Sequence, residues 1–291
     1  MGGNTFKDLE RVPREVLPEL FEEVSNRLNV PGLTTKYLNK AMLGSTGKKP
    51  TSGDVDLCMN NRFPRFYGQQ TYPVFNHRKL VKKLKLVLGE DCVRVGNSDQ
   101  VFTRWGNYQV DFLFGDFEWM KFSQYSPSPE ESDYKGLFLV NSFGVLSKMK
   151  RDVVYVNDEG MRVADVSFKF NLEHGFGRTW RLDSRARKFN RVDKAAPSKE
   201  DQLKKTDPDT FETRVPCDRY ERFWSRNPRD FLNMFFDGVQ FEEVNTFEKV
   251  VDFVRKKDYY EEFRERLLDQ HHRHAEMKRT VTYEKLEKAL A

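Results

Sequence analysis

Apolar residues recur at helical spacing in several parts of the chain. The segment 13–28 has the i, i+3, i+4 pattern of an amphipathic helix, which the Pro31-Gly32 pair is expected to end. The same spacing predicts a helix over 77–88, ended by Gly89. Further helices are predicted over 134–150, 219–236, 246–255 and 259–289.

Alternation of apolar and polar residues instead predicts strands. It does so over 54–59, and we expect a strand over 37–43 that runs into Gly44. Strands over 100–104 and 108–114 are joined by Trp105-Gly106-Asn107, which predicts a hairpin. Strands over 153–156 and 161–170 flank the turn residues 157–160, which predicts a second hairpin.

Together these elements predict an α+β fold, in which a small mixed sheet is flanked by helices and a C-terminal helical domain follows. Polar and charged residues dominate 185–209, so a linker is expected there. The resulting division is a mixed domain over 1–180, a basic linker over 181–209 and a helical domain over 210–291.

Composition restricts the class of protein. Apolar residues make up 38% of the 291 residues and aromatic residues 14%, which is typical of a folded globular chain. No apolar run approaches the roughly 20 residues that span a bilayer, and segment 1–13 has no hydrophobic signal core. The three cysteines are far apart, which excludes a disulfide framework or zinc knuckle and favours a cytoplasmic protein without a membrane partner.

The net charge is only +5, but cations concentrate in one stretch, 178–194. Only Asp183 and Asp193 oppose its cations, which are Arg178, Arg181, Arg185, Arg187, Lys188, Arg191 and Lys194. Such a block is typical of a surface that binds nucleic acid or polyphosphate. It is equally typical of a solvated linker, and both interpretations stay open.

The segment from Gly44 to Asp56 has the residues for phosphate and metal chemistry. Glycine lets backbone amides approach a phosphate, Ser45 adds a hydroxyl, and Lys48 with Lys49 adds charge. Asp54 and Asp56 are two apart in a predicted strand, so both carboxylates point to one face, where they can hold Mg²⁺. A P-loop is excluded, because Gly47-Lys48 is followed by lysine and no glycine lies five residues before Gly47.

A third acid would complete a site for two divalent ions, about 3.5–4 Å apart. Asp111 is the first candidate, because it lies inside a predicted apolar strand where an unused charge would be costly. Asp116 and Asp165 rank behind it. We expect Asp54 and Asp56 to bridge the ions and Asp111 to act as general base.

Two further lysines are candidates for contact with a triphosphate, Lys135 and Lys148, against the alternative that each is an ordinary helix-surface lysine. His271, His272 and His274 lie among cations and have no cysteine nearby. They are interpreted as a solvated helix face rather than a zinc site.

Taken together, Gly44-Ser45, Asp54-x-Asp56 and Asp111 resemble the motifs of the DNA polymerase beta-like nucleotidyltransferase superfamily, over roughly a quarter of the chain. The resemblance implies two Mg²⁺ ions, with Mn²⁺ as a substitute. It implies transfer of a nucleoside monophosphate from an NTP such as ATP to an acceptor hydroxyl, with release of pyrophosphate. The chain also resembles bacteriophage-encoded members, which would place it in the host cytoplasm.

The resemblance leaves the acceptor open. The basic stretch favours a nucleic acid, such as an RNA 3′ end. The alternatives are a synthase of oligonucleotide second messengers and a non-catalytic nucleic-acid-binding module that keeps the fold. The sequence does not determine the oligomeric state.

Overall fold

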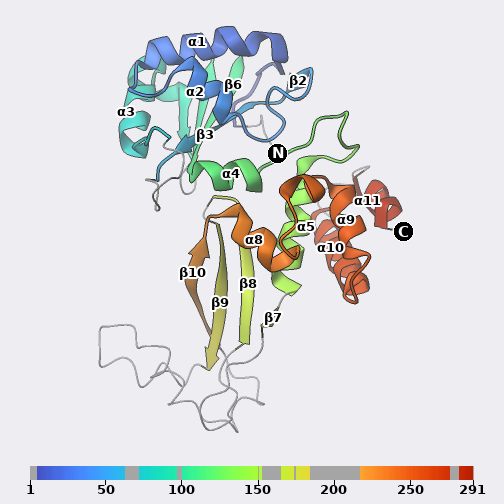
Figure 1. The fold of residues 1–291 in the computed structure, drawn as a ribbon. Helices are drawn as coiled ribbons and strands as arrows, with labels where there is room; N and C mark the ends of the chain where they lie inside the picture. The colour runs from blue at the N-terminus through green and yellow to red at the C-terminus, as the bar shows by residue number, and fades with distance from the viewer. Residues whose placement is uncertain are drawn as a thin grey trace, which may run out of the picture.

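The structure is a computed structural model that describes residues 5–62, 72–96, 100–149, 151–152, 165–173, 175–183, 217–275 and 282–290. It has an α+β fold of small sheets flanked by helices, as predicted (Figure 1). None of the described helices is long and apolar enough to cross a membrane. The predicted strand over 153–156, its turn at 157–160 and the whole polar segment 185–209 lie outside the described residues.

The N-terminal sheet has the order β3-β6-β5-β4. Its strands are β3 (Val55–Asn60), β6 (Tyr108–Gly115), β5 (Gln100–Trp105) and β4 (Val93–Val95). β3 pairs with β6 in parallel, and the other pairs are antiparallel. The predicted β5–β6 hairpin is confirmed, and its turn is Gly106-Asn107 with Gly106 at a φ of 57°.

One face of this sheet is covered by α1 (Leu17–Leu28) and α3 (His77–Leu88). Both helices were predicted, and both bury a stripe of apolar side chains spaced three or four residues apart. The short elements η1 (Arg14–Val16), β1 (Val12–Pro13) and β2 (Thr51–Ser52) join α1 to the loop before β3, and η2 (Glu90–Cys92) follows α3.

The predicted strand over 37–43 is wrong, because Thr35–Ala41 forms helix α2. The Thr34 side chain caps this helix by accepting a hydrogen bond from the Tyr37 amide at 3.2 Å. Seven residues are too few for periodicity to separate a helix from a strand. The Tyr37 hydroxyl donates to the Cys58 carbonyl at 2.8 Å and so ties α2 to β3.

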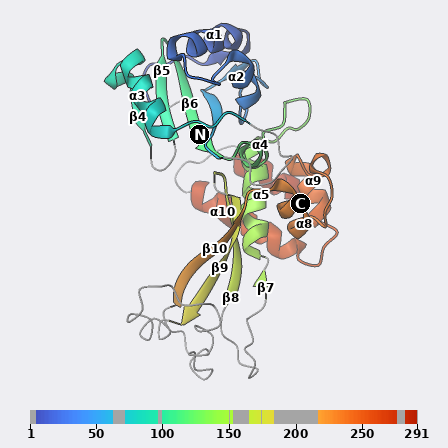
Figure 2. The ribbon, with the colours of Figure 1, turned by 60° about the vertical axis from the view of Figure 1, so that its left-hand side comes forward.

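The C-terminal part contains an antiparallel sheet of order β10-β9-β8-β7 (Figure 2). Its strands are β7 (Arg151–Asp152), β8 (Asp165–Asn171), β9 (Gly175–Asp183) and β10 (Cys217–Ser225). The helices are α4 (Phe117–Ser123), α5 (Gly136–Met149), α8 (Pro228–Phe235), η4 (Phe241–Glu243), α9 (Phe247–Val254), α10 (Tyr260–Ala275) and α11 (Thr282–Leu290).

The single helix predicted over 219–236 is therefore wrong in its first half. Residues up to Ser225 form β10, whose pairing with β9 joins residues far apart in sequence. Helix α8 begins only after Asn227, which caps it, and Pro228 occupies its first turn. The helices predicted over 134–150 and 246–255 are confirmed as α5 and α9, and the region 259–289 contains α10 and α11.

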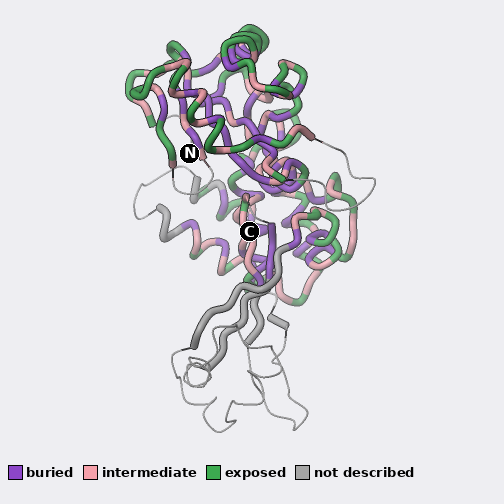
Figure 3. The backbone as a smooth tube through the Cα atoms, turned by 90° about the vertical axis from the view of Figure 1, so that its left-hand side faces the viewer, coloured by how far each residue is buried: buried purple, intermediate pink, exposed green. Residues whose placement is uncertain are grey.

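Two hydrophobic clusters lie inside the described residues, with exposed residues over their outer surfaces (Figure 3). The first joins α1, α2, α3 and the N-terminal sheet. The second joins α4, α5 and β8 to the C-terminal helices and contains many phenylalanines. The change from one cluster to the other falls in α4, where Met120 belongs to the first and Trp119 to the second. The division into 1–180, 181–209 and 210–291 stays a prediction.

Helix α4 lies between the two parts (Figure 1). The Trp119 indole donates to the Asn171 carbonyl at 2.8 Å, and the Ser123 hydroxyl donates to the Leu172 carbonyl at 2.6 Å. The turn between β8 and β9 is thereby fixed against the helix that follows β6.

The solvated helix face predicted around His271 is wrong for that residue. His271 is 7% exposed and stacks on Phe138, with ring centroids 5.3 Å apart. Its Nε2 lies 3.0 Å from the Asn141 side-chain amide of α5. The histidine therefore belongs to the packing between α5 and α10, and the side chains of His272 and His274 lie outside the described ones.

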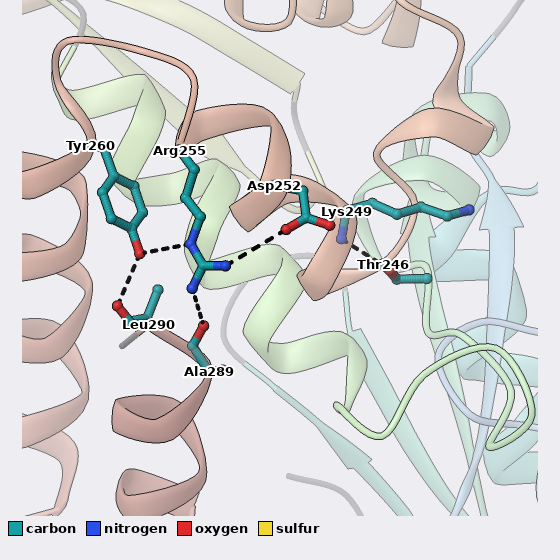
Figure 4. A network of polar contacts seen from close by, with 7 residues as sticks. All are labelled: Thr246, Lys249, Asp252, Arg255, Tyr260, Ala289 and Leu290. Carbon is teal, nitrogen blue, oxygen red and sulfur yellow. Dashed lines mark hydrogen bonds and ion pairs between the residues drawn. The ribbon is translucent and has the colours of Figure 1, made fainter.

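The end of α11 is held by Arg255, which follows the last residue of α9, and by Tyr260, the first residue of α10 (Figure 4). Arg255 donates to the Ala289 carbonyl at 3.2 Å, and the Tyr260 hydroxyl donates to the Leu290 carbonyl at 2.9 Å. Arg255 also donates to the Tyr260 hydroxyl at 3.3 Å, so the two side chains act together. These bonds satisfy carbonyls that the last turn of a helix leaves without an intrahelical partner.

We predict that Tyr260→Phe destabilises α11, because it removes one hydroxyl that both donates and accepts. The expected loss is about 1 kcal/mol of unfolding free energy. Amide hydrogen exchange over 282–290 and chemical denaturation measure it. Lys256→Gln, a change of an exposed neighbour, should leave both unchanged. Equal exchange rates in the tyrosine variant and the wild type would contradict the assignment.

Candidate functional site

The parallel pairing of β3 with β6 places two acids side by side. Asp56 and Asp111 are direct partners in the register of the two strands, so they lie on the same face of the sheet. Asp54 precedes Asp56 by two residues and joins them. One carboxylate oxygen from each of the three lies within 4.8 Å of the others.

The three carboxylates are largely withdrawn from water. Asp54 is 8% exposed and Asp111 4% exposed, while Asp56 is half-buried. Burial, followed by the negative charges of Asp54 and Asp111, raises the pKa of Asp56 well above its usual range. Burial also raises the pKa of Asp111 to about 7, with a smaller contribution from Asp54. A cluster of like charges at this depth is costly unless a cation compensates it.

A fourth side chain, Gln109, was missed by sequence reasoning. It is 1% exposed and lies on the same face of β6 as Asp111. Its Nε2 donates to both carboxylate oxygens of Asp111, at 2.9 and 3.1 Å, and lowers the pKa of Asp111 against the effect of burial. The two-residue spacing from Asp111 within a predicted strand is the signal that could have identified Gln109.

The turn at Gly44 lies directly beside the carboxylates. Gly44 has a φ of 57°, and a Cβ atom there would lie 3.3 Å from Asp56 Oδ2. The amide before it, on Leu43, donates to the Asp56 carbonyl at 2.9 Å. The Asp56 amide in turn donates to the Thr46 hydroxyl at 3.0 Å. Glycine therefore permits both the backbone conformation and the close approach to Asp56.

Lys48 and Lys121 converge behind this turn. Lys48 Nζ donates to the Ser126 carbonyl at 2.5 Å and lies 3.8 Å from the centre of the Tyr125 ring. Lys121 Nζ donates to the Met42 carbonyl at 2.7 Å. Burial, and then the charge of Lys121, lowers the pKa of Lys48 to about 8. Lys121 was not predicted, because it lies 77 residues after Gly44 in the numbering and reaches the turn only through the fold.

The other residues that were predicted to contact a phosphate lie in separate parts of the fold. Ser45 follows Gly44, and its carbonyl accepts a hydrogen bond from the Lys48 amide at 3.1 Å. Lys135 immediately precedes α5, whose first residue, Gly136, donates its amide hydrogen to the Ser126 hydroxyl. Burial, and then the positive charge of Lys135, lowers the pKa of Lys49. Lys148 lies in the last turn of α5, which at 14 residues is about 21 Å long. The structure does not bring Lys148 to the carboxylates.

The two alternative acids lie in other elements of the fold. Asp116 caps α4, and its carboxylate accepts a hydrogen bond from the Trp119 amide at 3.1 Å. Asp165 begins β8 in the second sheet. Among the described residues, the acid that joins Asp54 and Asp56 is Asp111.

Comparison with known proteins adds little to this geometry. No known family matches the chain, and no curated protein matches it in sequence. Two solved structures of polymerase beta from Leishmania infantum resemble it over 78% of its length. The ternary gap complex has a TM-score of 0.34 and 12% identity over 68% of that chain. The ternary P/T complex has a TM-score of 0.33 and 11% identity over 73% of that chain.

TM-scores this low do not identify the reaction of this protein. The reaction is therefore inferred from the three carboxylates. Bacteriophage origin and a cytoplasmic location stay predictions.

We predict that Gln109→Leu weakens the binding of a divalent ion, because the Asp111 carboxylate loses the amide that fixes its plane. Loss of such an outer hydrogen bond typically costs 10–100-fold in metal affinity. Calorimetric titration with Mn²⁺ measures the change. The metal-free melting temperature shows that the leucine is accommodated, and an unchanged Mn²⁺ affinity in a folded variant would refute the role.

The raised pKa of Asp111 predicts a specific dependence of stability on pH. In the metal-free protein the folded state holds this proton more tightly than the unfolded chain does. The free energy of unfolding should therefore fall as pH rises from about 4 to about 7. The rise in pKa from 3.8 to about 7 corresponds to a loss on the order of 4 kcal/mol.

Asp111→Asn should reduce this fall, leaving the part that the raised pKa of Asp56 contributes, and should stabilise the metal-free protein at pH 8. Urea denaturation between pH 4 and 8 in EDTA measures it. Added Mg²⁺ should restore the stability of the wild type above pH 7 and have little effect on the variant. A variant that is less stable than the wild type at pH 8 in EDTA would contradict the account.

Proposed function

We propose that this protein is a nucleotidyltransferase that transfers a nucleoside monophosphate from an NTP to an acceptor hydroxyl, with release of pyrophosphate. The observation that supports it most strongly is the convergence of Asp54, Asp56 and Asp111 beside the Gly44-Ser45 turn. A metal-binding trio and a glycine turn that approaches it are the two parts that the reaction requires.

The donor set suits Mg²⁺, a hard cation that prefers carboxylate and phosphate oxygens. All three candidate ligands are carboxylates, and burial and mutual repulsion raise the pKa of Asp56, an effect that a bound cation would reverse. Two bound ions, Mg²⁺ or Mn²⁺, would neutralise charge on the attacking and leaving oxygens. Asp54 and Asp56 are the residues proposed to hold both, with Asp111 completing the site.

The protein's own side chains would then position the reactants. In the metal-free protein burial raises the pKa of Asp111 to about 7. Bound divalent ions would favour its ionised form, which is the form that can accept a proton from the attacking hydroxyl. Lys48 and Lys121 lie against the Gly44 turn, where their charges would stabilise the triphosphate oxygens. A bound polyphosphate would raise the pKa of Lys48 again, because a negative charge favours the ammonium form.

The acceptor that we favour is a nucleic acid, such as an RNA 3′ end, with the basic stretch 178–194 as part of its binding surface. The side chains of that stretch lie outside the described ones. A synthase of oligonucleotide second messengers would use the same three carboxylates. A non-catalytic binding module would not, since it would retain the cost of clustered buried acids without any benefit.

The test is to incubate the protein with each labelled NTP, Mg²⁺ or Mn²⁺, and total cellular RNA. We expect label on RNA, and we expect Asp56→Asn to reduce transfer by more than about 100-fold, because the metals supply several kcal/mol. Asp116→Asn is the matched control, since asparagine still caps α4 and the residue lies outside the trio.

The other outcomes are decisive as well. A new soluble oligonucleotide would identify a synthase. A fully active Asp56→Asn, or activity lost only in Asp116→Asn, would overturn the assignment of the site. If no product forms with any NTP and either metal, the non-catalytic nucleic-acid-binding module becomes the favoured function.

A further inference from the structure

Helix α3 has an unusual charge distribution. Its twelve residues, His77–Leu88, contain five lysines and arginines and no acid. These cations are Arg78, Lys79, Lys82, Lys83 and Lys85. The whole chain is nearly balanced, with 50 basic and 45 acidic residues, so α3 departs strongly from the average.

The positions of these charges oppose the stability of the helix. Arg78 and Lys79 lie in the first turn, where the helix dipole favours acids and where none is present. Arg78 with Lys82, and Lys79 with Lys83, are like-charge pairs four residues apart, which repel each other on a helix surface. The helix keeps this repulsion, although one glutamate in its first two turns would relieve it.

Neighbouring elements do not compensate the first two turns. In the described part of the chain, Lys85 pairs with Glu90 at 2.6 Å. No ion pair joins an acid to Arg78, Lys79, Lys82 or Lys83 there. Arg78, Lys79 and Lys82 are exposed, and α3 lies at the outer edge of the N-terminal part, away from the C-terminal helices (Figure 2).

We propose that the exposed face of α3 binds the phosphate backbone of a nucleic acid. We call this set of Arg78, Lys79, Lys82 and Lys83 the α3 face. A polyanion would relieve the repulsion within the helix and match a row of cations spread over two turns. A helix of this composition could also bind an anionic membrane, but such binding needs an apolar face to insert. The apolar face of α3 is already buried through Leu80 and Leu84, and Leu86 is a single exposed side chain.

The α3 face lies on the opposite side of the sheet from the carboxylates. His77 of α3 contacts Phe114, whose side chain points away from the face that carries Asp111. Nucleic acid bound to α3 would therefore not occupy the position of the NTP. The inference does not depend on catalysis, and it can be tested with the reaction blocked.

The experiment measures binding of a fluorescein-labelled single-stranded RNA of 30 nucleotides by anisotropy, in EDTA, from 0.05 to 1 M salt. We compare the wild type with Lys79→Gln/Lys82→Gln. Each phosphate contact adds about 0.7 to the slope of log affinity against log salt, so the variant should lose about 1.4. If the two lines meet at 1 M salt, its Kd at 0.1 M salt rises roughly 25-fold.

Lys256→Gln/Lys288→Gln removes the same charge from exposed positions of the C-terminal part and is the matched control. The control should keep the wild-type slope. An equal loss in both double variants, or no loss in the α3 variant, would overturn the proposal. The proposal would also be overturned if the wild type bound phosphatidylserine vesicles but not RNA, and if the α3 variant lost this vesicle binding. RNA binding without nucleotide transfer would leave this proposal standing and remove the proposed function.

Discussion

The parallel pairing of β3 with β6 is the constraint on which the site depends. Residues 61–107 lie between the end of β3 at Asn60 and the start of β6 at Tyr108. The chain passes through α3, β4 and β5 in this interval before β6 pairs with β3. Their register places Asp56 opposite Asp111. A slip of one residue would turn one of the two carboxylates into the apolar layer under α1 and α3, because side chains alternate between faces. The buried stripe of Val110, Phe112 and Phe114 fixes the register, so packing of the core also fixes the geometry of the acids.

Two parts of the molecule each concentrate charges of one sign. On one face of the sheet, buried acids raise one another's pKa values. On the other face, α3 places cations against its own dipole and against each other. Each arrangement favours a ligand of opposite charge, a divalent cation in the first and a polyanion in the second. Since the sheet separates them, both ligands can be bound at once.

Much of the site could be predicted from the sequence, because its spacing is local. Asp54 and Asp56 share a face through the two-residue period of a strand, and Asp111 was distinguished from Asp116 by its apolar neighbours. Gln109 could have been found by the same period. Lys121 could not, since only the packing of α4 against the Gly44 turn brings it there.

The errors in the fold have a similar origin. Short α2 was predicted as a strand, because about two turns of helix give too little periodicity. β10 was predicted as helix, because strand pairing with β9 depends on residues far away in sequence. Lys148 was proposed for the triphosphate from its charge, and it lies in the last turn of α5. That contact stays a prediction.

The central claim is that the three carboxylates form one divalent-metal site beside a nucleotide. A crystal grown with Mn²⁺ and a non-hydrolysable NTP analogue tests it most directly, because Mn²⁺ is located by its anomalous scattering. We expect Mn²⁺ among Asp54, Asp56 and Asp111, with the triphosphate against the Gly44 turn. Mn²⁺ bound elsewhere, or a nucleotide bound away from these residues, would contradict it.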